Sequence, residues 1–195
     1  LNLALNIKDH GFDIIGYNRG EEKRVKARKE GLKVADSLDE VRDFFGNEKR
    51  IFWVMVEADA VDVVLEQAAE YLRKGDVIIE GGNSYFKDTE RRVKWAEEKG
   101  LTYIGTGVSG GEAGARYGPS IMPGGTKEAY NSVAPILEAI AAKAPQDNKP
   151  CVSYNGHGGA GHFVKIAHNG IEYGVMAMIG EVAWLLKESL GLDFK

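Results

Sequence analysis

Residues 76–108 read "DVIIEGGNSYFKDTERRVKWAEEKGLTYIGTGV", with an apolar run at each end and an amphipathic stretch between them. Both apolar runs are continuous rather than alternating, which is typical of strands that are covered on both faces. The middle predicts a helix over residues 88–99, with Asp88 as its N-cap and Gly100 just past its end. Strand–helix alternation of this kind predicts a doubly wound, mainly parallel sheet.

The same alternation extends along most of the chain. Further helices are predicted over about 1–9, 20–31 and 59–73, and further strands in "FDIIGYN" (12–18), "RIFWVMV" (50–56) and "PCVSYNG" (150–156). From about Gly159 the strands stop, and one long helical pattern runs to Leu190. The break near residues 155–161 is the likeliest domain boundary, so the sequence predicts an α/β, Rossmann-like domain over residues 1–157 and a separate, helical segment over 158–195.

The composition is that of an ordinary soluble globular protein, with 44% hydrophobic and 28% charged residues among 195. A formal charge of -4 leaves no basic patch of the size that nucleic acid requires. The single cysteine excludes an internal disulfide framework and fits a reducing compartment. No signal peptide and no run of about 20 apolar residues is present, so neither export nor a membrane span is predicted. The expected location is cytoplasmic.

The stretch "YNRG" (17–20) ends the first predicted strand and precedes a basic helix. At the end of the second strand of a Rossmann sheet, an acid reads the ribose 2′-hydroxyl, whereas an arginine can pair with a 2′-phosphate. Asn18 and Arg19, with no acid beside them, favour NADP over NAD, although an arginine at a strand end is often only solvated. If residues 12–18 are that second strand, the first strand and its glycine loop are missing from this chain.

The stretch "KIAHNGIEYG" (165–174) places five polar side chains on one face of the long predicted helix, at Lys165, His168, Asn169, Glu172 and Tyr173. Lys165 and Glu172 are separated by about 10 Å along the helix axis. A base and an acid so spaced could act at opposite ends of a small polyol acid. An adjoining arc at the same period predicts the packing face, formed by Val164, Ala167, Ile171, Val175, Met178 and Val182.

Three glycine-rich stretches are candidates for backbone contacts with a ligand. "GHGGAG" (156–161) matches a dinucleotide fingerprint, but no second strand follows it, so a hinge into the long helix is the better interpretation. Within residues 105–125, Ser109, Gly110 and Gly111 are suited to grip a carboxylate, unless this stretch is a flexible loop. "EGGN" (80–83) ends a strand where open α/β sheets bind ligands, so Asn83 is either a ligand contact or a turn former. The histidines show no metal-ligand spacing, and no metal site is predicted.

Motifs through nearly the whole chain resemble those of the 6-phosphogluconate dehydrogenases, a decarboxylating family of the pentose phosphate pathway. The matching stretches are "NLALNI", "GYNR", "GDVIIEGGNSYFKDTERR", "GVSGGEAGARYGPSIMPGG" and "GAGHFVKIAHNGIEYG". Other β-hydroxyacid dehydrogenases share the serine–glycine–glycine turn and the lysine-bearing helix, whereas "ARYGPSIMPGG" and "HNGIEYG" are more specific. The resemblance implies oxidative decarboxylation of 6-phosphogluconate to ribulose 5-phosphate and CO2 with reduction of NADP, in a cytoplasmic homodimer.

The resemblance also implies a role for each motif. Lys165 matches the general base that takes the C3 hydroxyl proton, and Glu172 matches the acid that protonates C1 of the enediol. No metal is implied, because the 3-keto group serves as the electron sink. The implied substrate contacts are Asn83, Ser109, Gly110, Gly111, His168, Asn169 and Tyr173 (the last to the phosphate). The implied NADP contacts are Asn18, Arg19, Gly20, Val56, Glu57, Ala58 and Asn83.

Three residues depart from the family pattern. Glu57 stands where lysine is usual, Glu80 where aspartate is usual, and Gly20 where a hydroxyl residue often holds the 2′-phosphate. The phosphate loop that should precede Leu1 and most of the helical domain are also missing, so we expect a chain truncated at both ends. The isolated chain is expected to be inactive, and the complete protein active. Two alternatives stay open: another β-hydroxyacid dehydrogenase, or a non-catalytic truncated module.

Overall fold

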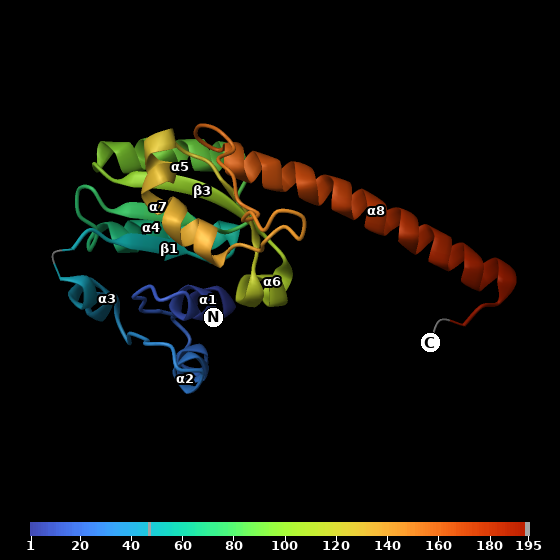
Figure 1. Ribbon diagram of the computed structural model, residues 1–195, viewed down its shortest axis with the longest axis horizontal. Helices are drawn as coiled ribbons and strands as arrows, with labels where there is room; N and C mark the ends of the chain where they lie inside the picture. Colours follow the sequence, from blue (N-terminus) through green and yellow to red (C-terminus); the bar gives the residue numbers. More distant parts are fainter. Residues whose placement is uncertain (47, 194–195) are drawn as a thin grey trace.

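A four-stranded sheet in the order β1-β2-β3-β4 lies at the centre of the computed structural model, which describes residues 1–46 and 48–193. Strands β1 (Ile51–Val54), β2 (Val77–Glu80) and β3 (Thr102–Ser109) are parallel, and β4 (Ser120–Pro123) pairs antiparallel with β3. The predicted α/β, mostly parallel sheet is therefore confirmed (Figure 1).

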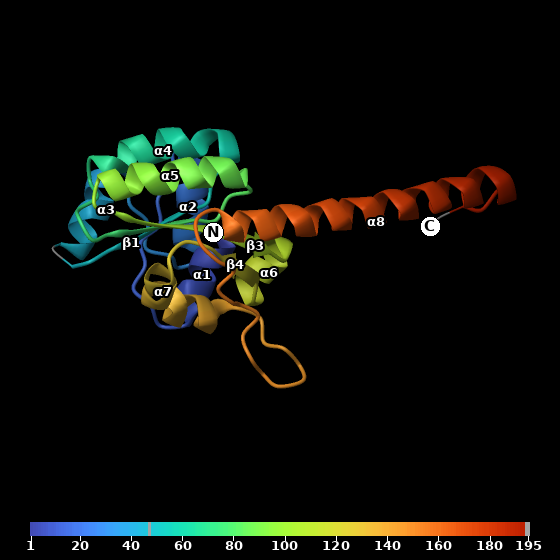
Figure 2. The same ribbon diagram turned by 90° about the horizontal axis from the view of Figure 1, so that it is seen from above.

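Helices cover both faces of this sheet (Figure 2). Val77 and Ile79 of β2 pack in one core cluster with residues of α1 and α7, whereas Ile78 packs in another with residues of α4 and α5. Burial on both faces explains why the β2 run is continuously apolar. The helices are α1 (Asn2–Asp9), α2 (Glu21–Lys29), α3 (Leu38–Phe45), the 3-10 turn η1 (Ala58–Ala60), α4 (Val61–Ala69), α5 (Phe86–Glu98), α6 (Gly111–Tyr117), α7 (Lys127–Ile140) and α8 (Ala160–Leu190).

Two predicted strands are not regular strands in the structure. Residues 12–18 make a single bridge, Gly16 with Val34, and residues 150–156 make two isolated bridges, Val152 with Ile121 and Pro150 with Lys143. Among the described residues, Gly16 exchanges hydrogen bonds only with the backbone of Lys33 and Ala35, and the bonds from residues 150–156 to β4 lie apart, at Cys151 and Asn155, so neither segment forms a continuous ladder. The prediction was wrong here because apolar β-branched residues indicate burial without supplying a neighbour.

Two helix boundaries also differ from prediction. Helix α5 begins at Phe86 with Tyr85 as N-cap, and Asp88 lies inside the first turn, where its N–H already donates to the Tyr85 carbonyl. Gly100 does follow the helix, at φ +69°, as predicted. The helix expected over 59–73 is divided into η1 and α4 and ends at Ala69.

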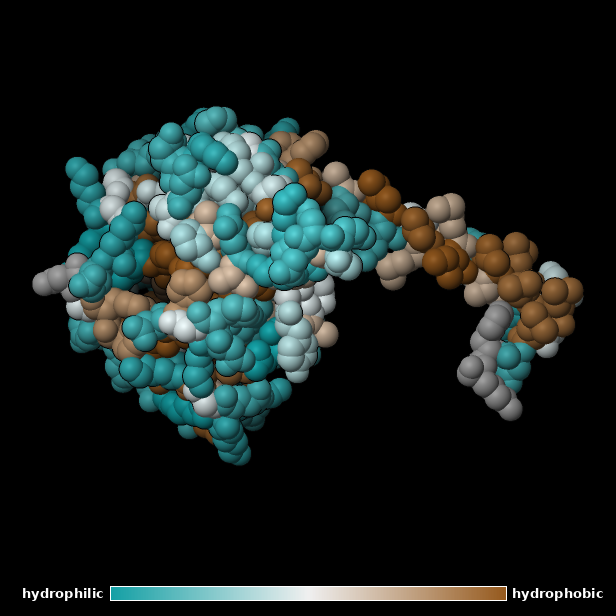
Figure 3. All heavy atoms as spheres, in the orientation of Figure 1, coloured by the Kyte–Doolittle hydropathy of each residue, from teal (hydrophilic) through white to brown (hydrophobic). Residues whose placement is uncertain are grey.

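The long C-terminal helix is confirmed as α8, which contacts β3, β4 and α5 at its beginning and then projects away from the sheet (Figure 1). No described element covers the projecting part of the predicted packing face, which therefore stays a prediction there. Most of the projecting apolar residues are exposed (Figure 3), including Ile171, Val175, Met178 and Val182. Among the described residues, no helix is long and apolar enough to cross a bilayer.

Candidate active site

Seven of the fifteen predicted site residues gather at one edge of the sheet, because the carboxyl ends of parallel strands lie together. The 56–58 turn follows β1, Asn83 follows β2, and Ser109 ends β3. The first two loops touch: a Cβ added at Gly82 would lie 2.8 Å from the Val56 carbonyl oxygen. Asn83 is exposed although both glycines before it are buried, so its side chain is presented outward.

Ser109, Gly110 and Gly111 form an ordered turn from β3 into α6. Gly110 has φ +132° and Gly111 φ +62°, in the region that favours glycine, and the Gly114 N–H donates to the Gly110 carbonyl at 2.9 Å. The stretch 105–125 is therefore β3, α6 and β4 in succession, and the alternative of a flexible loop is wrong. The turn exposes the backbone of Gly110 and Gly111 beside a serine hydroxyl.

Lys165 lies in the part of α8 that packs on β3, and its side chain is buried. A Cβ at Gly107 would lie only 2.6 Å from the Lys165 Cβ, so the helix can approach the strand this closely only over a glycine. Burial lowers the pKa of the Lys165 amine below its ordinary value, and the Glu172 carboxylate opposes that shift. An amine that loses its proton more easily than usual is suited to act as a base.

The other members of the polar stripe lie on the exposed part of α8. His168 Nδ1 is 3.1 Å from Asn169 Oδ1 and 3.7 Å from Glu172 Oε2, and Tyr173 is 66% exposed. The predicted polar face of α8 is thus present, but its residues lie in two different environments. Lys165 is held against the sheet, whereas His168, Asn169, Glu172 and Tyr173 stand beyond it.

Asn18, Arg19 and Gly20 form a separate turn before α2. The Gly20 N–H donates to Asn18 Oδ1 at 2.9 Å, and Arg24 Nη1 donates to the carbonyls of Asn18 and Arg19 at 2.8 and 3.0 Å. The backbone of the turn is fixed by Arg24, and Arg19 itself is exposed. Within residues 1–46 and 48–193, no hydrogen bond or ion pair joins this turn to the other site residues.

A group of buried polar side chains that was not predicted from the sequence lies beneath the site. We name it the Glu80 cluster; it comprises Glu80, Ser84, Thr89, Arg92, Tyr103 and His162, each at most 4% exposed. One signal was available in the sequence: His162 precedes Lys165 by three residues, so both lie on the same face of α8. The departure noted at Glu80 was a second signal, since a buried carboxylate requires partners.

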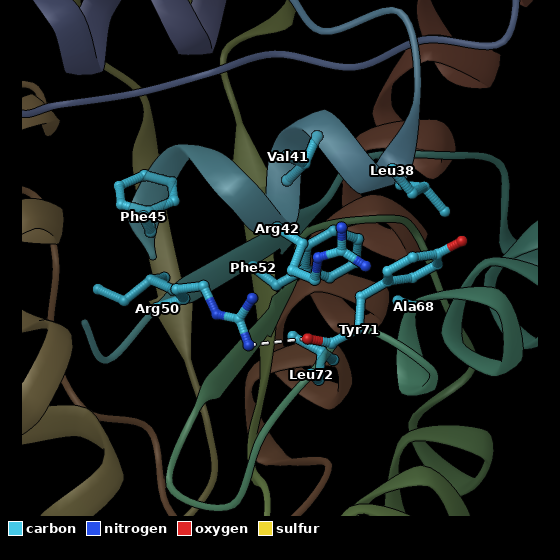
Figure 4. Close-up of a pocket in the computed structure, with 10 residues that line it drawn as sticks. Leu38, Val41, Arg42, Phe45, Arg50, Phe52, Ala68, Tyr71 and Leu72 are labelled. Atoms are coloured by element: carbon cyan, nitrogen blue, oxygen red, sulfur yellow. Dashed lines mark hydrogen bonds between the residues drawn. The ribbon is translucent and has the colours of Figure 1, made fainter. Parts of the chain in front are cut away.

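A small cavity lies at the opposite edge of the sheet, between α3, α4 and the start of β1 (Figure 4). Its volume is about 30 Å³, room for a water molecule or two, and its lining includes Phe45, Phe52, Tyr71 and Leu72. None of the predicted site residues lines it. Among the described residues, no group of three or more histidine, cysteine or acidic side chains could hold a metal ion.

Comparisons with known proteins cover the whole chain. Residues 1–156 match the family model for the NAD binding domain of 6-phosphogluconate dehydrogenase, and residues 161–195 match that for its C-terminal domain. The decarboxylating 6-phosphogluconate dehydrogenase of Lactococcus lactis subsp. lactis (strain IL1403) is 49% identical over 98% of this chain and 42% of its own length. The chain thus spans about two-fifths of the length of such relatives.

Two solved structures show the fold. The Plasmodium falciparum 6-phosphogluconate dehydrogenase, solved without ligand, with NADP+ and with 6-phosphogluconate, has a TM-score of 0.84 and 43% identity over 98% of this chain and 42% of that one. The Mycobacterium tuberculosis 3-hydroxyisobutyrate dehydrogenase, solved with L-serine, has a TM-score of 0.80 but 22% identity, over 98% of this chain and 62% of that one. The second likeness shows the fold alone.

Proposed function

This chain belongs to the 6-phosphogluconate dehydrogenase family, and on that premise we propose that it supplies the NADP-binding sheet and the catalytic helix of an enzyme that oxidatively decarboxylates 6-phosphogluconate. The products are ribulose 5-phosphate, CO2 and NADPH. The observation that carries this proposal is the buried Lys165, whose pKa is lowered by burial, packed on Gly107 beside the turn of Ser109 to Gly111.

The residues at the carboxyl edge fit a dinucleotide. The turn of Val56, Glu57 and Ala58 and the Asn83 loop are in contact, so one ligand can touch both. Arg19 is exposed on a turn that Arg24 fixes, which suits a 2′-phosphate. Glu57 is also exposed, so its carboxylate can point to solvent while the backbone of the turn meets the ligand. Asn18 and Gly20 complete this contact set, and NADP supplies the hydride acceptor.

Lys165 acts as the general base in this proposal. A neutral amine takes the proton of the C3 hydroxyl as the C3–H bond breaks, and burial raises the fraction of amine that is neutral at working pH. The resulting 3-keto acid then loses its carboxyl group as CO2, because the keto group accepts the electron pair of the breaking C1–C2 bond. Lys165, now protonated, remains beside the developing oxyanion and stabilises it.

Glu172 then returns a proton to the carbon that lost CO2, which becomes C1 of the pentose. Its position two turns along α8, about 10 Å from Lys165 along the axis, suits the other side of a six-carbon acid. Ser109, Gly110 and Gly111 grip the substrate carboxylate, Asn83, His168 and Asn169 meet its hydroxyls, and Tyr173 meets its phosphate.

The same proposal divides the chain into two domains. Residues 1–157 form the NADP-binding domain, and residues 158–195 begin the helical domain, whose exposed apolar side chains favour burial against further protein. That requirement supports a homodimer as the working form. The single free cysteine, Cys151, supports a cytoplasmic location.

The test follows NADPH absorbance with 6-phosphogluconate and NADP, using the full-length gene product that contains this chain. We expect turnover in the wild type and its loss in Lys165→Met, which keeps the length of the side chain without a base. Lys187→Met, an exposed lysine in the last turn of the same helix, is the matched control and should keep the activity.

A parallel assay with 3-hydroxyisobutyrate separates the alternatives. Turnover of that acid but not of 6-phosphogluconate would replace the proposed substrate with a small unphosphorylated one. A folded protein that turns over neither acid would instead be a non-catalytic module.

A further inference from the structure

We propose that the Glu80 cluster is a positioning device, which fixes the Asn83 loop and the first turns of α8 together and so sets where Asn83 lies relative to Lys165. The inference rests on the proposed function for the roles of these two residues, and neither the mechanism nor the family resemblance above assigns the cluster a role. None of its side chains reaches the substrate surface, because all are buried.

The first arm of the device closes the loop that carries Asn83. The Ser84 hydroxyl donates to Glu80 Oε1 across the loop, so the residues on both sides of Gly81-Gly82-Asn83 are joined. Arg92 Nη1 of α5 donates to Ser84 Oγ at 2.9 Å and to Glu80 Oε2 at 3.3 Å. The Tyr103 hydroxyl of β3 donates to the same Oε2 at 2.7 Å. The loop is therefore tied to α5 and to β3 through one carboxylate.

The second arm holds the beginning of α8. His162 lies one turn before Lys165, and its Nδ1 is 2.7 Å from Thr89 Oγ1 of α5. Its Nε2 faces Glu80 Oε1 at 3.9 Å. A neutral ring with its proton on Nε2 suits both neighbours, since the Thr89 hydroxyl can donate to Nδ1 and the N–H then faces a carboxylate. Burial lowers the pKa of His162, which keeps the ring neutral.

Glycines allow the second arm and the Lys165 turn to pack closely on β3. A Cβ at Gly105 would lie 2.3 Å from Thr89 Cγ2 and 3.0 Å from His162 Nδ1, so β3 admits the pair only because it has no side chain there. Two residues further along the same strand, Gly107 admits Lys165. Strand β3 thus sets how closely α8 approaches the sheet. The Glu80 cluster sets the orientation of α8 and its position relative to the Asn83 loop.

The opposite end of β2 provides a matched control. Asp76 comes just before β2 and Glu80 ends it, and both carboxylates are buried and paired with a buried arginine. Asp76 accepts from Arg50 Nη2 at 2.7 Å and from Nε at 3.1 Å. Loss of either carboxylate charge disturbs a buried ion pair on the same strand, but only Glu80 lies at the edge that holds Asn83 and Lys165.

The first experiment compares Glu80→Gln with Asp76→Asn in the full-length gene product. Both variants should lower the midpoint of thermal unfolding. Only Glu80→Gln should lower kcat, on the order of 10- to 100-fold with little change in KM, because a base displaced by about 1 Å costs roughly that factor. Glu80→Asp, which keeps the charge but shortens the reach, should fall between wild type and Glu80→Gln. Equal kcat in Glu80→Gln and Asp76→Asn would overturn the proposal.

The second experiment needs no turnover and uses the same full-length gene product. The Lys165 amine is titrated by NMR with lysine labelled at Cε, in wild type, Glu80→Gln, Asp76→Asn and Thr89→Val. Loss of the Glu80 charge by itself would lower the Lys165 pKa further, whereas displacement of the amine toward solvent would raise it toward the ordinary value. We expect a rise in Glu80→Gln and Thr89→Val and no change in Asp76→Asn.

Thr89→Val keeps the shape of the side chain and changes no charge. It therefore tests the positioning role if Glu80→Gln does not fold. An unchanged Lys165 pKa in Thr89→Val would overturn the second arm, and a further fall in Glu80→Gln would reduce Glu80 to a purely electrostatic neighbour. A wild type that turns over no 6-phosphogluconate would instead refute the proposed function, while the titration still tests the positioning.

Discussion

Substituting Gly107 by alanine tests how Lys165 is placed, because the new methyl group would lie 2.6 Å from the Lys165 Cβ. Ordinary contact between such atoms begins at 3.4 Å, so Lys165 must retreat by about 0.8 Å. The carbonyl oxygen of Gly161, one turn earlier in α8, would also lie 3.1 Å from the new methyl group. Gly107→Ala therefore pushes the first turns of α8 away from β3.

The expected cost follows from that displacement. A catalytic group moved by about 1 Å loses on the order of 100-fold in rate, which is roughly 2.7 kcal/mol of transition-state stabilisation. Overpacking also costs about 1–3 kcal/mol of folding stability, or roughly 3–10 °C in the thermal midpoint of a domain of this size. We expect Gly107→Ala to lower kcat on the order of 10- to 100-fold in the NADPH assay.

The control for this variant is Gly180→Ala, the same substitution in the projecting part of α8, where nothing lies within 4 Å of the new Cβ. It should leave kcat unchanged and raise helix stability by about 0.5–1 kcal/mol. If Gly107→Ala kept the wild-type kcat while remaining folded, the close packing of β3 on α8 would have no part in placing Lys165.

Three further predictions concern stability. Burial lowers the native pKa of Lys165, so its ammonium form destabilises the fold. Lys165→Met should therefore raise the free energy of unfolding at neutral pH, and urea titrations should show that gain shrinking as pH rises from the lowered native value to the ordinary 10.5. Hydrogen bonds from Arg92, and also from Arg91, lower the pKa of Asp62 to about 2, so an NMR titration midpoint near the ordinary 3.8 would contradict the geometry. The stability from Asp62 should be present above pH 3.8 and lost as pH falls through about 2, and Asp62→Asn should remove this dependence. The Thr126 hydroxyl caps α7, so Thr126→Ala should cost about 1 kcal/mol in thermal unfolding.

The sequence predicted most of the sheet because apolar runs at strand length and amphipathic stretches at helix length are local signals. The existence and order of strand β2 and helix α5 were predictable from these local signals. The exact start of α5 was not, because Asp88, predicted as the N-cap, already lies within the first turn. The strand predictions for residues 12–18 and 150–156 were wrong for another reason. Strand formation requires a neighbour, and a one-residue bridge such as Gly16 with Val34 leaves an apolar segment without a ladder.

The site was predictable to a similar degree. Helical spacing alone placed Lys165 and Glu172 on one face, and the carboxyl ends of parallel strands bring the segments after β1, β2 and β3 to one edge of the sheet. The burial of Lys165 could not be predicted from α8 alone, since it depends on Gly107, which is 58 positions away in the chain. His162 was missed for the same reason, because its partners belong to β2 and α5.

The projecting helix gives the proposed acid and base different surroundings. Lys165 lies against the sheet, where burial disfavours its charged form, and Glu172 stands two turns further along, on the exposed stretch. A general acid must carry its proton when it acts, and burial of a carboxyl group favours the protonated form. Exposed apolar side chains around Glu172 favour packing of further protein on this stretch. Ile171 and Val175, both exposed beside it, are the apolar surface that such a cover would bury. One helix can thus hold a base and an acid in separate environments because only its beginning is packed on the sheet.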